Sequence, residues 1–189
     1  LEKRNFSENL LKTMNMMLEV DVLYIKQIEQ SYLPKLRKLL YLLAVNAPGT
    51  PNVSQLSKAI ETSRATVMNY IKYLADARLV NMLYPAGEAF PKKPAKVYMY
   101  NSNLMYPIRP MQVNEDTVRE TFFYNQLQKD SSLNQGQKNA HFLVDGRYDF
   151  RVEETVPARA NPELYYAVEK ASAGERQNII PLWLFGFLY

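Results

Sequence analysis

The segment of residues 52–80 constrains the fold of this chain more than any other part: NVSQLSKAIETSRATVMNYIKYLADARLV. Its first apolar residues have the spacing of a short helix that ends at a Glu61-Thr62 turn. Ser63 is a typical N-cap for a second helix, because its hydroxyl can accept a hydrogen bond from an amide of the first turn. Two helices joined by so short a turn form a helix-turn-helix. The residues expected to face inward are Val53, Leu56 and Ile60 in the first helix and Val67, Tyr70, Ile71 and Leu74 in the second.

The residues on either side complete a larger pattern. Residues 35–46 are too apolar for a surface helix and predict a core helix, and the following APGTP run at 47–51 predicts a loop. After the second helix, Leu79 to Tyr84 predicts a strand, and Lys96 to Tyr100 predicts a strand that returns beside it. Three helices followed by a hairpin indicate a winged helix over residues 35–100.

Residues 1–34 are expected to form a helical segment that leads into this unit. From Asn5 to about Ser31, apolar residues recur at helical spacing, until Pro34 interrupts the pattern. The expected inward face consists of Leu10, Met14, Met17, Leu18 and Val22.

Positive charge is concentrated in the winged-helix segment. Residues 35–100 carry ten lysines and arginines against three acidic residues, a net charge of +7. Residues 1–34 and 101–189 carry −1 and −2. Such a concentration suits an anionic partner, although a solvated basic surface gives the same count.

The inward stripe of the second helix leaves other side chains facing outward. Residues at the start of a recognition helix usually meet base edges, and lysines on a wing can meet phosphates. Winged helices also serve as packing or protein-contact modules, so a protein partner or a second copy of the chain is the alternative to double-stranded DNA. The predicted DNA-contacting residues are Arg64, Thr66, Asn69 and Lys72 on the helix and Lys92, Lys93 and Lys96 on the wing.

Residues 101–189 have a different character. Asn114 to Gln128 predicts a helix, followed by a polar loop over residues 131–139. In AHFLVDGRYDFRVEET, Asp145-Gly146 separates two apolar-rich runs, which is a strong hairpin signal. Leu164 to Val168 predicts a short strand. The helix residues expected to face inward are Val118, Phe122 and Leu127.

The carboxy-terminal run IIPLWLFGFLY is strongly apolar. At eleven residues it is shorter than the ~20 that a membrane-spanning helix requires. We therefore expect a buried terminal segment, with membrane or partner contact as the alternative.

Several segments together resemble one known arrangement. They are YLPKLRKLLYLLA, the helix-turn-helix, KKPAKVYMYNSNLMY, VRETFFYNQL, HFLVDGRYDF and IIPLWLFGFLY. In order and spacing the sequence resembles the carboxy-terminal half of a family of prokaryotic AAA-type ATP-binding proteins. In that family an ATPase is followed by a winged helix and a PD-(D/E)XK nuclease-like domain.

The resemblance implies an α/β fold class, α+β overall. A winged helix-turn-helix would be followed by a restriction-endonuclease-like α/β domain over residues 101–189. The ATPase would lie upstream of Leu1. The six glycines are scattered singly and no G-x-x-x-x-G-K-[ST] loop occurs, so no nucleotide site can be assigned here. ATP and Mg²⁺ are expected only in the upstream domain, and no cofactor is expected in this chain.

A nuclease of that type needs carboxylates, because oxygen ligands must hold a divalent cation while it polarises a phosphodiester. The resemblance matches Glu120 in VRETFF to the helix glutamate of the family. The family carries an acidic residue where this chain has His141, glutamate where it has Arg151, and lysine where it has Thr155. One carboxylate holds Mg²⁺ poorly. We therefore expect a degenerate nuclease-like domain without a catalytic or metal site, in a chain that is not itself an enzyme.

Two alternatives stay open. If the alignment slides, nearby acidic residues restore a site, and the chain would be a Mg²⁺-dependent nuclease using Glu120 with Asp149 or Glu153. The chain could instead be a protein-protein assembly module. The hairpin register bears on the first alternative: a two-residue turn pairs His141 with residue 150, whereas a three-residue turn pairs it with residue 151.

Composition excludes several chemistries. Cysteine is absent, which removes disulfides and thiolate sites, and His141 is the only histidine, which removes Ser-His-Asp triads and zinc-type histidine clusters. No apolar run is long enough to span a bilayer, and the amino end lacks the apolar core of a signal peptide. A cytoplasmic protein without membrane contact is the expectation.

Overall fold

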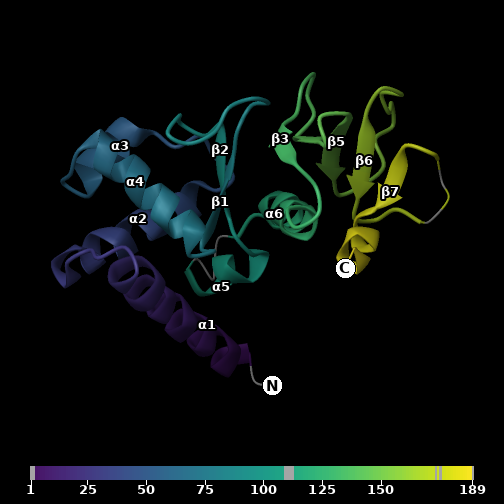
Figure 1. Ribbon diagram of the computed structural model, residues 1–189. Coiled ribbons are helices and arrows are strands. Elements are labelled where there is room, and N and C mark those ends of the chain that lie inside the picture. Colours follow the sequence, from purple (N-terminus) through teal and green to yellow (C-terminus); the bar gives the residue numbers. More distant parts are fainter. Residues whose placement is uncertain (1–2, 109–112, 173, 175, 189) are drawn as a thin grey trace. The chain divides into compact units, whose positions relative to one another are not determined.

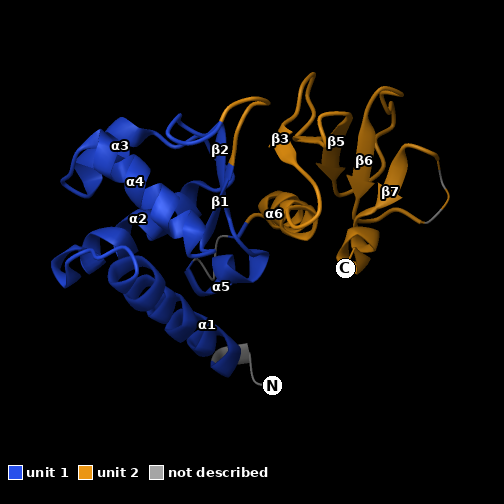
Figure 2. Ribbon diagram, viewed as in Figure 1, with its two compact units in different colours: residues 1–82, 89–113 blue, residues 83–88, 114–189 orange. Residues whose placement is uncertain are grey.

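The computed structural model describes residues 3–108, 113–172, 174 and 176–188 (Figure 1). The fold is mixed α/β, with one two-stranded and one five-stranded sheet in the described residues. The chain forms two compact units (Figure 2). The first comprises residues 1–82 and 89–113, and the second comprises residues 83–88 and 114–189. Within the described residues, no helix has both the length and the apolarity needed to cross a membrane.

The first unit begins with a helix that ends earlier than the sequence suggested. Helix α1 (Lys3–Met17) continues into a short π-helix, η1 (Leu18–Tyr24), and a turn follows. After a 3₁₀ turn, η2 (Gln30–Tyr32), helix α2 (Leu33–Asn46) starts. Pro34 therefore does not interrupt a helix; it lies in the first turn of α2, where a missing amide hydrogen costs nothing. Of the expected inward residues, Met14, Leu18 and Val22 are buried, whereas Leu10 and Met17 are half-buried.

Two helices joined by a short turn form where the sequence predicted them, although Val53, expected to face inward, is only half-buried. Helices α3 (Val53–Ala59) and α4 (Arg64–Asp76) follow α2. Ser63 caps α4, its Oγ accepting a hydrogen bond from the Thr66 amide at 3.0 Å. The apolar stripe of α4 is buried because its residues share one helical face. That stripe consists of Val67, Tyr70, Ile71 and Leu74.

A hairpin completes this part of the unit. Strands β1 (Val80–Leu83) and β2 (Lys96–Met99) pair with each other. On β2, Val97 also forms an isolated antiparallel bridge with Gly49, where the Val97 amide donates to the Gly49 carbonyl at 2.9 Å. The loop between α2 and α3 therefore runs beside β2. A 3₁₀ turn, η3 (Ser102–Leu104), and helix α5 (Met105–Ile108) follow, and α5 packs against α1 and α2.

The second unit places one helix, α6 (Glu115–Leu127), against a five-stranded sheet. The strand order is β3-β4-β5-β6-β7; β3, β4 and β5 run antiparallel, and β6 and β7 are added in parallel. The strands are β3 (Leu133–Gln135), β4 (Phe142–Val144), β5 (Tyr148–Glu153), β6 (Tyr165–Val168) and β7 (Ile179–Pro181). The polar loop expected at 131–139 thus contains strand β3.

The buried face of α6 is displaced by one residue from the expected one. Phe123 is fully buried and its ring lies 4.9 to 5.2 Å from the rings of Phe142, Phe150 and Phe185. The expected inward residue Phe122 is only half-buried, as is Val118, whereas Leu127 is buried as predicted. The spacing of apolar residues did not predict the buried face of α6 correctly, because that face also contains the polar residues Arg119, Glu120 and Thr121.

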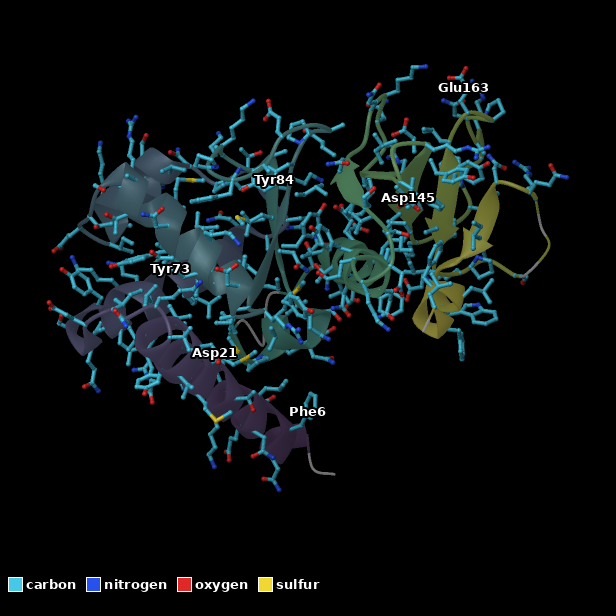
Figure 3. All side chains as sticks on the ribbon, in the orientation of Figure 1. Phe6, Asp21, Tyr73, Tyr84, Asp145 and Glu163 are labelled. Atoms are coloured by element: carbon cyan, nitrogen blue, oxygen red, sulfur yellow. The ribbon has the colours of Figure 1, made fainter. Side chains whose placement is uncertain are left out.

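The hairpin between β4 and β5 has a three-residue turn, Asp145, Gly146 and Arg147. The flanking pairs are Val144 with Tyr148 and Phe142 with Phe150. Both Asp145 and Gly146 have positive φ, 52° and 64°. The Asp145 carboxylate (Figure 3) accepts a hydrogen bond from the Ser132 amide at 2.8 Å, which fastens the turn to the residue before β3. In this register position 141 lies opposite position 151.

The apolar carboxy-terminal run is only partly buried. It forms β7 and a 3₁₀ segment, η4 (Leu182–Phe187). Leu182 and Phe185 are buried, but Trp183 is 51% exposed and Phe187 is 66% exposed. The expectation of a wholly buried tail was therefore wrong for the outward side of η4.

Candidate nucleic-acid interface

A concave surface lies between the start of α4 and the loop that precedes β2. One part of it is a hollow of about 400 Å³. An adjoining hollow of about 520 Å³ extends the surface to residues 50–54, at the start of α3. Arg64 and Lys93 line both hollows. The lining of the first hollow consists of Val53 from α3, Arg64, Ala65, Met68 and Asn69 from α4, and Phe90, Pro91 and Lys93 from the loop.

Three of the predicted DNA-contacting residues meet on this surface. Arg64, Asn69 and Lys93 are exposed, and they come from two segments that the fold brings together. The surface therefore carries two cations and one side-chain amide. Phe90, Pro91 and Met68, which the sequence did not single out, supply its apolar wall. Nothing in their spacing indicated this role, because it depends on how the loop folds back over α4.

Thr66 has a local role in the helix start. Its Oγ1 lies 2.8 Å from Ser63 Oγ, and its amide donates to the same oxygen. The side chain is half-buried and is not among the residues that line either hollow. Thr66 thus belongs to the cap of α4.

Lys72 lies further along α4 and is held by an acidic residue. Its ammonium group forms an ion pair with Asp76, one turn away. Lys26 also donates to Asp76, at 2.8 Å, and lies 5.3 Å from the centre of the Tyr73 ring (Figure 3). Burial raises the pKa of the Asp76 carboxyl, but the hydrogen bonds from Lys26 and Lys72 outweigh burial and lower that pKa below its ordinary value.

The two remaining lysines flank the hollow without lining it. Lys92 is exposed, next to Lys93. Lys96 is half-buried at the start of β2, with its ammonium group 5.9 Å from the centre of the Tyr98 ring.

The nuclease-like positions lie in the second unit. Glu120 on α6 is buried, and its Oε1 is 3.7 Å from His141 Nδ1. The same Nδ1 accepts a hydrogen bond from the Val152 amide at 3.2 Å, so His141 satisfies a backbone donor of β5. Arg151 is ion-paired with Glu153, two residues along β5. Thr155 is exposed in the bend that follows this strand.

The guanidinium of Arg119, a residue that the sequence did not single out, lies among three carboxylates. Its guanidinium is buried and lies 3.5 Å from Asp116, 3.5 Å from Glu154 and 3.3 Å from Glu169. Lys170 also pairs with Glu154, and this hydrogen bond lowers the pKa of the Glu154 carboxyl. The one sequence feature that could have indicated this role of Arg119 is its position directly before the helix glutamate Glu120.

The carboxylates of this region thus have internal partners. Asp149 accepts a hydrogen bond from the Gln137 amide at 3.1 Å, and Glu153 is paired with Arg151. Among the residues that the structure describes, no three His, Asp or Glu side chains are grouped to hold a metal ion. The donors around Glu120 do not fit a hard divalent cation, which prefers several oxygen ligands.

The fold and this surface define a mixed α/β protein whose first unit presents a basic concave face. The chain belongs to the family described as Domain of unknown function (DUF8612), whose model matches residues 1–115. The matched region contains every residue of the concave surface. No curated protein and no solved structure matches the chain.

Proposed function

We propose that the first unit is a winged helix that binds double-stranded DNA, and that this chain acts by binding and not by catalysis. The order of elements supports the winged helix: α2, a short bridged segment at Gly49, α3, α4, and the β1-β2 hairpin. In such a unit α4 is the recognition helix and the loop before β2 is the wing.

The observation that carries the proposal is that Arg64, Asn69 and Lys93 line one hollow. Phosphate contacts by lysine and arginine provide most of the affinity for DNA and fix the position of the protein on the duplex. Arg64 on the helix and Lys93 on the wing would each contact a DNA phosphate, from the two sides of the surface. Asn69 lies on the helix side of the same hollow, where a base edge would be read.

The charge distribution supports an anionic partner for the same unit. The +7 of residues 35–100 contrasts with the slightly negative remainder of the chain. A basic face of this kind raises the local concentration of an anionic partner, and the effect weakens as salt screens it.

The second unit would then serve as a scaffold. Glu153, Glu154 and Glu169 are already paired with Arg119, Arg151 or Lys170, and Glu120 lies beside His141. The resemblance supports a cytoplasmic setting beside an AAA-type ATPase domain, whose nucleotide state would be communicated to the DNA-binding unit.

Binding to a short labelled duplex, measured by fluorescence anisotropy at low salt, tests the proposal. The triple variant Lys92→Ala, Lys93→Ala, Lys96→Ala should bind more weakly than the wild type. Circular dichroism should show an unchanged fold, because Lys92 and Lys93 are exposed and Lys96 lies at a strand end. An absence of duplex binding by the wild type, or equal binding by the triple variant, would contradict the proposal and favour a protein partner.

A further inference from the structure

Asn69, on the outward face of α4, has a side chain suited to reading an adenine. The positions that lie on this face are Arg64, Ala65, Met68, Asn69, Lys72 and Asp76. Lys72 and Asp76 bind each other, so the second half of the face is already occupied by an internal ion pair. Arg64 lines both hollows together with Lys93, which fits contacts to the backbone phosphates on either side.

Asn69 differs from these residues because its amide has both donors and an acceptor. The side chain is exposed and lines the hollow, and in the described part of the chain it has no hydrogen-bonding partner. Asparagine can form two hydrogen bonds with an adenine edge in the major groove, accepting from N6 and donating to N7. No other common base edge offers that pair of groups in this arrangement.

Apolar side chains lie beside Asn69 on the same face. Ala65 is one helical turn before it and Met68 is its immediate neighbour, and both line the hollow. Thymine carries a methyl group in the major groove, which small or apolar side chains contact. An amide flanked by apolar groups thus matches adenine and the thymine methyl together.

We propose that Asn69 reads an adenine and that Ala65 and Met68 contact a thymine methyl, so that the bound duplex contains a required A·T pair at the centre of the footprint. This inference rests on the proposed DNA binding and specifies which DNA is preferred. Arg64 and Lys93 would provide sequence-independent affinity, and Asn69 would provide the discrimination.

The test begins with selection of bound duplexes from a random-sequence pool by the full chain. In the selected site, each A·T pair is replaced by G·C, each adenine by 7-deazaadenine, which lacks N7, and each thymine by uracil, which lacks the methyl group. One A·T position should lose about tenfold in affinity on replacement by G·C or by 7-deazaadenine. The loss with uracil at or next to that pair should be smaller.

The variants then assign the effect to one side chain. Asn69→Ala should bind the selected duplex and its 7-deazaadenine counterpart equally, and should keep only the smaller preference that the thymine methyl provides through Ala65 and Met68. Asn69→Gln should retain part of the preference, because glutamine presents the same amide. Both substitutions are on an exposed helical position where alanine and glutamine are good helix formers, so the fold should persist.

The outcomes separate this inference from the proposed function. Salt-sensitive duplex binding without any A·T preference, or a loss with 7-deazaadenine that is as large in Asn69→Ala as in the wild type, would overturn the reading by Asn69 and leave DNA binding intact. A chain that binds no duplex at low salt would overturn both.

Discussion

Lys26 Nζ lies 2.8 Å from Asp76 Oδ2, so the segment that follows η1 is fastened to the last turn of α4. Lys72 binds the other carboxylate oxygen of Asp76. One acidic residue therefore pairs with two lysines at the carboxy-terminal end of α4. On α4 and the loop before β2, Arg64 and Lys93 line the hollows, whereas Lys72 is held by Asp76.

Removing this acidic residue should strengthen DNA binding. In Asp76→Asn one negative charge is lost and Lys26 and Lys72 are released, so we expect a several-fold higher affinity for duplex DNA at low salt. The slope of log affinity against log salt should become steeper by roughly 0.9 for each lysine that gains a phosphate. Asp21→Asn, which removes the same charge from the lead-in segment, is the matched control and should have a smaller effect. Equal effects of the two variants would show that only net charge matters.

The same ion pairs predict a pH dependence of stability. The pKa of Asp76 is lower in the folded state than its ordinary value, so its pairing stabilises the fold above the unfolded-state pKa of about 3.9. That contribution is lost as the pH falls through the folded-state pKa. Thermal unfolding between neutral pH and pH 3 should therefore show a shallower decline of Tm below pH ~4 in Asp76→Asn than in the wild type. Parallel profiles would contradict this role of Asp76.

The one-residue displacement of the buried face of α6 can be tested with neighbouring phenylalanines. Phe123→Ala removes a fully buried ring and should destabilise the second unit by about 3–5 kcal/mol. Phe122→Ala removes a half-buried ring and should cost clearly less. Urea unfolding followed by circular dichroism measures both. Similar losses in the two variants would contradict the assignment of the face.

The local parts of the fold could be predicted from the sequence, because short-range patterns determine them. The spacing of Val67, Tyr70, Ile71 and Leu74 and the cap at Ser63 identified α4. The face of α6 could not be predicted in the same way, since Arg119 and Glu120 are buried through partners far along the chain. Strand β3 was missed because its sequence, LNQ, lacks the alternation of a half-buried strand.

The candidate surface was likewise predictable from the sequence only in part. The outward positions of α4 were predictable once its inward stripe was known. That Lys93 reaches the hollow with Arg64, and that Lys72 is instead held by Asp76, depends on contacts between segments distant in sequence. Spacing along one helix carries no information about such contacts.

The second unit should show no metal-dependent cleavage. Because Arg119, Arg151 and Lys170 neutralise the carboxylates near Glu120, we expect labelled duplex DNA to remain intact with the pure chain in Mg²⁺ or Mn²⁺. The metal ions should also leave the Tm of the protein unchanged. Cleavage that disappears in Glu120→Gln would contradict the scaffold role and establish the nuclease alternative.

The central claim is that Arg64 and Lys93 bind DNA phosphates from the two walls of one hollow, and the salt dependence of duplex binding tests it most directly. The double variant Arg64→Ala, Lys93→Ala should lose affinity at low salt, and its slope of log affinity against log salt should be shallower by about 2. The control Lys38→Ala, Lys58→Ala removes two exposed cations from α2 and α3 and should keep nearly the wild-type slope. A double variant with the wild-type affinity and slope would contradict the account.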